Sequence, residues 1–163
     1  MPRTTFDTLP PTARLWIFAA DRELDEPEAD HLLAAVDRFL DDWTAHRQHL
    51  TAAREWRHAR FLLVGVDESM ASASGCSIDA LIREITRLEQ AMGVTLADSG
   101  PVLFRQGTTI ERVTREQFLK LAASGVVGPD TSVFDNTLAT VNDLRAGRWE
   151  LPARETWHAR AFF

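Results

Sequence analysis

Arg60-Phe-Leu-Leu-Val-Gly-Val-Asp67 is the stretch of the chain that decides the fold. All the residues between its two charged ends are apolar, which predicts a central strand covered on both faces. A second strand is predicted at 50–57, and the joint between the two strands is short enough for a hairpin. We therefore expect this hairpin to form the middle of a sheet.

A helix is predicted on each side of the hairpin. Before it, Asp25-Glu-Pro-Glu28 has the residues of a helix start, with a capping aspartate, a proline in the first turn and a glutamate three residues on. Apolar residues at spacings of three and four extend this helix over about 26–46 and place His46 on its inward stripe. After the hairpin, a helix is expected to begin at Ser77 and to stop at Gly93.

Two further strands, at 13–20 and 101–105, complete the order strand, helix, strand, strand, helix, strand. This order is typical of a ferredoxin-like core, here over residues 12–105, in which two helices cover one face of a four-stranded antiparallel sheet. The other face would be free for a partner, a ligand or the C-terminal segment. The fold class predicted is α+β.

Residues 106–163 are expected to form a separate α/β extension packed on this core. Thr114-Arg-Glu-Gln117 is a capping box that opens a helix, and Gly125 closes it. A short strand is predicted within 126–134. The tail from Thr156 to the C-terminus is apolar enough to dock on the rest of the protein.

The chain has 163 residues, and 18 Lys and Arg against 24 Asp and Glu give a net charge of −6. An apolar content of 45% is typical of a soluble globular protein. No apolar run approaches the length of a membrane span, and the N-terminal residues do not have the pattern of a signal peptide. The single cysteine, Cys76, excludes an internal disulfide. A cytoplasmic location is expected.

Cys76 is the first residue to which the sequence gives a chemical role. A helix N-terminus stabilises a thiolate or a bound anion through its unpaired amides and its dipole. The groups expected around this sulfur belong to Ser74, Gly75, Ser77 and Asp79. The alternative is structural: with Ser77 as N-cap, Cys76 would pack on Leu81 as a buried hydrophobic staple.

An enzyme built on Cys76 would need a base or a metal. His46 or His158 could act as the base or as a ligand, with Asp67 or Asp79 orienting it. Cys76, His158 and Asp67 could also bind one zinc ion with an open fourth position. No phosphate loop and no dinucleotide fingerprint occurs in the sequence, so no nucleotide cofactor is predicted.

A basic and aromatic stretch, Arg54 to Arg60, gives a further alternative. Arg54, Trp56 and His58 alternate in phase, and on an open sheet face they could stack nucleic-acid bases. The negative net charge argues against this use. A strand at the edge of a sheet, guarded by charges, gives the same pattern.

The motifs of the chain resemble a family of small bacterial proteins, frequent in Bacteroidetes-related bacteria and often labelled "ABC transporter ATPase". The resemblance runs end to end and rests on the following stretches: Leu9–Trp16, Phe39–His46, Ser74-Gly-Cys-Ser-Ile-Asp79, Thr131–Phe134, Trp149–Ala153 and Thr156–Arg160. It adds Trp43 and Trp157 to the candidate ligand-binding residues. Arg47 departs from it, because a glycine is expected after the histidine. The chain has none of the motifs of an ABC ATPase.

Residues 101–153 are similar to bacterial GYF-like modules, which are small binding modules associated with peptide recognition. The leading hypothesis is a binding or regulatory protein with a ligand site at the Ser74–Asp79 loop and a protein or a small molecule as partner. A thiol- or zinc-dependent enzyme and a nucleic-acid binder are the alternatives.

Overall fold

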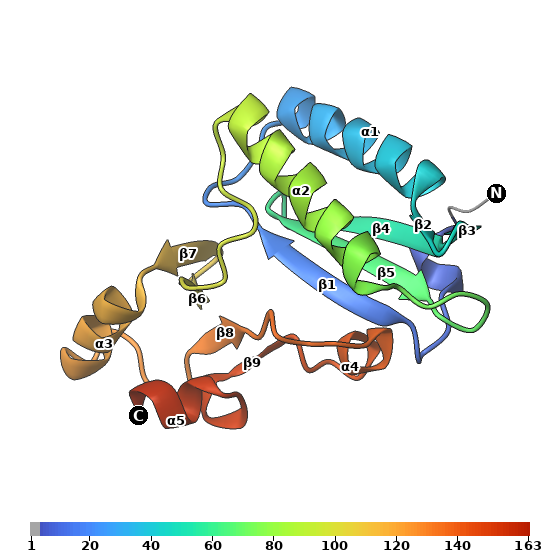
Figure 1. The fold of residues 1–163 in the computed structure, drawn as a ribbon. Coiled ribbons are helices and arrows are strands. Elements are labelled where there is room, and N and C mark those ends of the chain that lie inside the picture. The colour runs from blue at the N-terminus through green and yellow to red at the C-terminus, as the bar shows by residue number, and fades with distance from the viewer. Residues whose placement is uncertain (1–3) are drawn as a thin grey trace. The chain divides into compact units, whose positions relative to one another are not determined.

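The computed structural model describes residues 4–163, which divide into two compact units (Figure 1). Unit 1 contains the residues up to Asp98 and Ala139–Asn142, and unit 2 contains Ser99–Leu138 and Asp143–Phe163. Helices and antiparallel sheets make up both units, so the α+β class is confirmed. No helix within residues 4–163 has the length and apolar character needed to cross a membrane.

Unit 1 is built on a three-stranded antiparallel sheet in the order β1-β5-β4. Its elements are η1 (Phe6–Thr8), β1 (Arg14–Ala19), α1 (Glu26–Asp42), β2 (Thr44–Ala45), β3 (Gln48–His49), β4 (Thr51–Arg57), β5 (Phe61–Asp67) and α2 (Gly75–Met92). Strand β5 lies in the middle and is buried from Phe61 to Val66, which confirms the predicted central hairpin. Helices α1 and α2 lie side by side over one face of the sheet (Figure 1).

The opposite face of this sheet is covered at its centre, although the sequence predicts it to be open. A Cβ atom added at Gly65 would lie 2.5 Å from Leu9 Cδ1 and 3.4 Å from Phe6 Cε2. Phe6 and Leu9 are both buried. The N-terminal segment therefore packs directly on the backbone of β5, and the glycine is what allows this close approach.

The predicted fourth strand forms but is not part of this sheet. It becomes β6 (Val102–Gln106), which pairs with strands of unit 2. The free edge of β1 is instead used by two short segments of unit 1. The amides of Ala19 and Asp21 donate to the carbonyls of Leu96 and Thr95, and residues 139–141 bond to the other end of the strand. The edge that a fourth strand would need is thus already occupied.

Helix α1 is shorter than predicted, and this moves His46 out of the apolar stripe. The helix ends at Asp42, and Trp43 adopts an extended conformation. The amide of Leu50 donates to the carbonyl of Trp43, which closes the small β2–β3 hairpin. His46 lies exposed at the tip of this hairpin, so its predicted place on a helix is wrong.

The β2–β3 turn lies at Arg47, the position where a glycine is expected from the sequence. His46 and Arg47 have φ angles of 51° and 67°, so both lie in the left-handed region. A two-residue hairpin turn of this kind favours glycine at its second position. The tight turn therefore occurs at Arg47 without the residue that best fits it.

We predict that Arg47→Gly stabilises the protein by about 1 kcal/mol, because it removes the cost of a left-handed L-residue. The gain is the difference between this relief and the larger backbone entropy of glycine in the unfolded chain. Urea unfolding measures the change. Arg47→Ala removes the same side chain but keeps the Cβ atom, and it should give no such gain; equal stabilisation by both variants would contradict the turn argument.

Unit 2 has a four-stranded antiparallel sheet in the order β7-β6-β8-β9. Its further elements are β7 (Thr109–Val113), α3 (Arg115–Ala123), β8 (Ser132–Phe134), β9 (Glu150–Pro152), η2 (Ala153–Glu155) and α5 (His158–Phe162), and the short helix α4 (Val141–Arg145) begins in unit 1 and ends in unit 2. The predicted capping box of α3 is present, with Thr114 and Gln117 bonding to each other's amides. Phe104 and Phe118 meet edge to face in the core, with their ring centroids 5.4 Å apart.

Candidate functional site

The first turn of α2 is the place to which the sequence assigns the candidate site. The N-cap is Ser74 and not Ser77: Ser74 Oγ accepts from the amide of Ser77, and Ser77 Oγ accepts from the amide of Ser74. The helix therefore begins at Gly75, and Cys76 lies in its first turn with an exposed side chain. The alternative of a buried staple formed by Cys76 and Leu81 is wrong.

Trp43 connects the end of α1 to this turn. Its side chain is buried, and its Nε1 donates to the carbonyl oxygen of Ser77 at 2.8 Å. The indole also meets Phe39 at 5.5 Å and Trp16 at 6.0 Å between ring centroids. Two predicted ligand-binding residues, Trp43 and Ser77, are thus brought into contact with each other, and the indole fixes where α2 begins relative to α1.

A pocket of about 340 Å³ lies beside Trp43, between the last turns of α1 and the first turns of α2. We refer to it as the α1–α2 pocket. Its lining residues are Arg38, Phe39, Asp42, Trp43, Thr44 and Ala80. Cys76 precedes Ala80 by four residues, so both occupy the same face of α2. Cys76 is exposed and is not among the residues that line the pocket.

The ends of two helices set the electrostatics of the α1–α2 pocket. The last turn of α1 has no basic residue to offset the negative end of its dipole, and the first turn of α2 has no acidic residue to offset the positive end. Within residues 4–163, the charged groups of Arg38 and Asp42 have neither a hydrogen bond nor an ion pair. The pocket thus presents one cation and one anion.

Asp67, a predicted carboxylate, and its neighbour Glu68 both bond to the loop that follows β5. Asp67 Oδ1 accepts from the amide of Ser69 at 3.0 Å, and Glu68 Oε2 accepts from the amide of Ala73 at 2.8 Å. They tie the loop between β5 and α2 to itself. Asp79 is exposed in α2. Among residues 4–163, no group of three His, Cys, Asp or Glu side chains could hold a metal ion, so a zinc site gains no support.

His158 is buried in unit 2, and the partly buried Trp157 packs on it. His158 is only 1% exposed, and its Nδ1 lies 2.8 Å from Thr156 Oγ1. The imidazole stacks on the indole of Trp157, with the ring centroids 3.8 Å apart. The Arg115 guanidinium lies over the same indole, 5.0 Å from its centroid. Burial lowers the pKa of His158 to about 4. The imidazole is therefore neutral at pH 7, as an aromatic core requires.

The Arg54–Arg60 stretch does not form a free basic surface. Arg54 pairs with Asp37 of α1, and Arg57 pairs with Glu55. Arg60 is buried, and its Nη2 donates to the carbonyl of Asp21. Trp56 packs against the core on the helix side of the sheet. The three arginines of this stretch are therefore each bonded to another group of the protein, whereas His58 is exposed.

Sequence reasoning missed most of the lining of the α1–α2 pocket. Arg38 and Asp42 are four residues apart on the polar side of α1, which by itself indicates only a solvated face. Phe39 lies next to them at the border of the apolar stripe. An aromatic residue at the border between the apolar and polar faces of α1 was the only sign of a binding site in the sequence. The pocket itself forms because Ala80 of α2 lies beside Phe39.

Comparison with known proteins adds no relative to this picture: no family model matches the chain, and neither a curated protein nor a solved structure matches it.

Proposed function

We propose that the protein is a non-catalytic binding protein that holds a small ligand in the α1–α2 pocket. The observation that carries the proposal is the pocket itself, walled by an indole that is locked to the first turn of α2. Its volume is at the lower end of the range for small-molecule sites, which is about 300–1,000 Å³. Its aromatic wall and its two charges also match such sites.

The chemistry of the lining suggests the class of ligand. The ligand is a zwitterion with an apolar side, such as a free amino acid. Its carboxylate faces Arg38 and the N-terminus of α2, and its ammonium faces Asp42 at the end of α1. Its apolar part lies against Phe39 and Ala80. Each charge of the ligand thereby faces a group of opposite charge, and its apolar part faces apolar side chains.

Titration with L-phenylalanine tests the proposal, with binding monitored through the NMR signals of the backbone amides and of the indole N–H groups. We expect saturable shifts at Thr44, Ala80 and the Nε1 proton of Trp43. Phenethylamine and 3-phenylpropionate each lack one of the two charges and should bind more weakly, because each leaves one pocket charge without a partner. Shifts confined to other residues, or equal affinity for all three probes, would contradict the proposal.

Two matched variants separate the pocket from the rest of α2. Ala80→Leu fills the pocket and should abolish the shifts, whereas Ala91→Leu, on an exposed part of the same helix, should leave them unchanged. A thiol-dependent enzyme at Cys76 is the alternative. Turnover of the bound amino acid that disappears in Cys76→Ser would overturn the non-catalytic part of the proposal.

We also propose a fold for each unit, a family and a cellular location. Unit 1 is a ferredoxin-like core without its fourth strand, supported by the strand order β1-β5-β4 and the helices after β1 and β5. Unit 2 is a GYF-like module, supported by α3, β8 and the run Trp149–Ala153. The chain belongs with the small bacterial family that its motifs resemble. The exposed free thiol of Cys76 supports a cytoplasmic location.

A further inference from the structure

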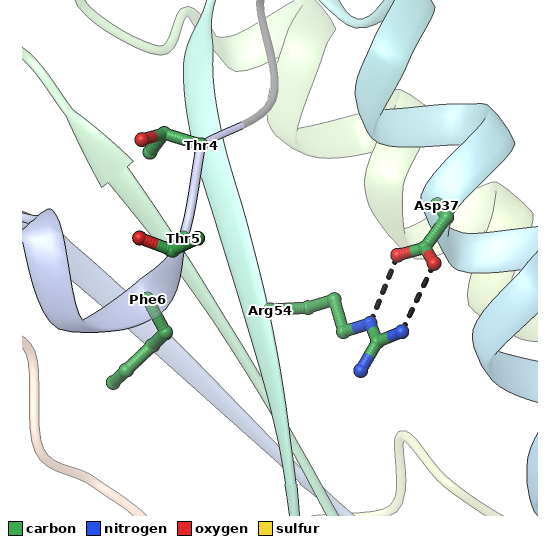
Figure 2. A pocket seen from close by; sticks show the side chains of 5 residues that line it. All are labelled: Thr4, Thr5, Phe6, Asp37 and Arg54. Carbon is green, nitrogen blue, oxygen red and sulfur yellow. Dashed lines mark hydrogen bonds and ion pairs between the residues drawn. The ribbon is translucent and has the colours of Figure 1, made fainter.

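A second pocket, of about 480 Å³, lies in unit 1 beside the outer edge of β4 (Figure 2). Its lining residues come from three segments and are Thr4, Thr5, Phe6, Asp37 and Arg54. We refer to it as the Arg54 pocket. None of these residues lines the α1–α2 pocket, so an inference about the Arg54 pocket does not depend on the proposed function.

Arg54 is the one basic side chain among these lining residues, and it is held in a fixed position. It reaches from β4 to α1, where Nε and Nη2 donate to the two carboxylate oxygens of Asp37, both at 2.9 Å (Figure 2). The side chains of the pair are only 29% and 22% exposed. Such a two-point bond fixes the plane of the guanidinium as well as its place.

Part of the guanidinium remains available to a ligand. Figure 2 shows Nη1 on the side of the group that is turned away from Asp37. No residue within 4–163 bonds to Nη1. The edge formed by Nη1 and the second proton of Nη2 can therefore bind another carboxylate through two parallel bonds. Because Asp37 already orders this side chain, a ligand does not have to supply that ordering entropy.

The opposite wall of the Arg54 pocket does not compete for this edge. Thr4 Oγ1 and Thr5 Oγ1 are both hydrogen-bonded to Thr8 Oγ1, and their side chains point away from Arg54 (Figure 2). Phe6 also points away and is buried. The main chain of the N-terminal segment thus forms one side of the pocket, and the Arg54–Asp37 pair forms the charged side.

We propose that the Arg54 pocket binds a small organic acid with a single negative charge, whose carboxylate bonds to the free edge of Arg54. One negative charge is favoured over two because Asp37 lies on the far side of the same guanidinium. A dianion would be repelled by the Asp37 carboxylate more strongly than a monoanion. The binding group is therefore a carboxylate in preference to a phosphate.

Three probes with the same ring test the ligand class on the unaltered protein: benzoate, benzamide and phenyl phosphate. Binding is followed through the Nε–Hε NMR signal of Arg54 and the amides of Thr5 and Asp37. Benzoate should give saturable shifts at these positions, and benzamide should bind at least about tenfold more weakly, because it lacks the charge. Phenyl phosphate should bind more weakly than benzoate. Equal affinities for benzoate and benzamide would overturn the proposal, and tighter binding of phenyl phosphate would overturn the choice of a carboxylate.

Two lysine variants test the role of Arg54 itself. Arg54→Lys keeps the charge but loses the second edge, so benzoate affinity should fall by at least about tenfold. Arg57→Lys is the matched control, because Arg57 lies on the same strand in its own carboxylate pair but does not line the pocket. Its benzoate affinity should be unchanged. An equal fall in both variants, or no fall in Arg54→Lys, would overturn the assignment. The benzoate and benzamide comparison stands even if Arg54→Lys does not fold.

Discussion

Trp43→Ala is expected to destabilise unit 1 by about 3–5 kcal/mol, the usual cost of truncating a large buried aromatic side chain. Trp43 is 3% exposed and makes ring contacts with Trp16 and Phe39. Its loss leaves a cavity at the point where α1, α2 and the β2–β3 hairpin meet. It also leaves the carbonyl of Ser77 without the indole donor.

Trp43→Phe separates the two contributions. Phenylalanine keeps an aromatic ring but has no N–H group, so the cost should fall to about 1–2 kcal/mol, most of it from the lost hydrogen bond. Urea unfolding followed by far-UV circular dichroism measures both changes. Trp56→Ala is the control, because Trp56 is a half-buried tryptophan of the same unit. A cost for Trp43→Ala no greater than that for Trp56→Ala would contradict the placement of Trp43.

These values matter for the proposed function because Trp43 also lines the α1–α2 pocket. A tryptophan that served only to contact a ligand would be dispensable for folding. We expect instead that Trp43 is required for the fold, and that the ligand contacts only the part of the ring that the core leaves uncovered. For this reason Ala80→Leu is the better probe of binding, since Ala80 lies outside the buried core.

The elements of the fold that could be predicted are those whose signal is local. The apolar run of β5, the start of α1 at Asp25 and the capping box at Thr114 are each contained within a few residues, and each is present in the structure. The start of α2 is the instructive exception. Ser74 and Ser77 can both cap a helix, and a capping box closed by a second serine is a weaker signal than one closed by glutamate. The two possible N-caps are three residues apart. With Ser77 as N-cap, Cys76 would precede the helix and be buried, whereas with Ser74 it lies within the helix and is exposed.

The partner of a strand is not a local property, and this is where the prediction from sequence was incomplete. The pattern of residues 101–105 is that of a buried strand in either sheet. Its sheet depends on which segment occupies the edge of β1, and residues 139–141, which are distant in sequence, occupy part of it. The pockets depend on packing in the same way. Asp37 and Arg54 belong to different elements, and no spacing in the sequence indicates that they meet.

Lowering the pH from 7 to 4 is expected to remove about 3 kcal/mol of stability from unit 2 through His158 alone, since each pKa unit is worth about 1.4 kcal/mol. Burial among aromatic rings lowers the pKa of His158 from 6.5 to about 4, with Arg115 acting in the same direction and Asp135 opposing both. The folded state thus holds this imidazole neutral, whereas the unfolded chain takes up a proton below pH 6.5. The stabilisation is complete above pH 6.5 and is lost as the pH falls toward 4.

The pH profile of the unfolding free energy, measured for three proteins, tests this expectation. His158→Gln removes the titrating group, so the loss of stability between pH 6.5 and 4 should shrink by about 3 kcal/mol relative to the unaltered protein, whatever its stability at pH 7. His31→Gln is the matched control, because His31 is exposed on α1 of the other unit, and its profile should follow that of the unaltered protein. Parallel profiles for the His158→Gln variant and the unaltered protein would contradict a buried neutral imidazole. A direct NMR titration of the His158 ring, with a midpoint near 6.5, would contradict it independently.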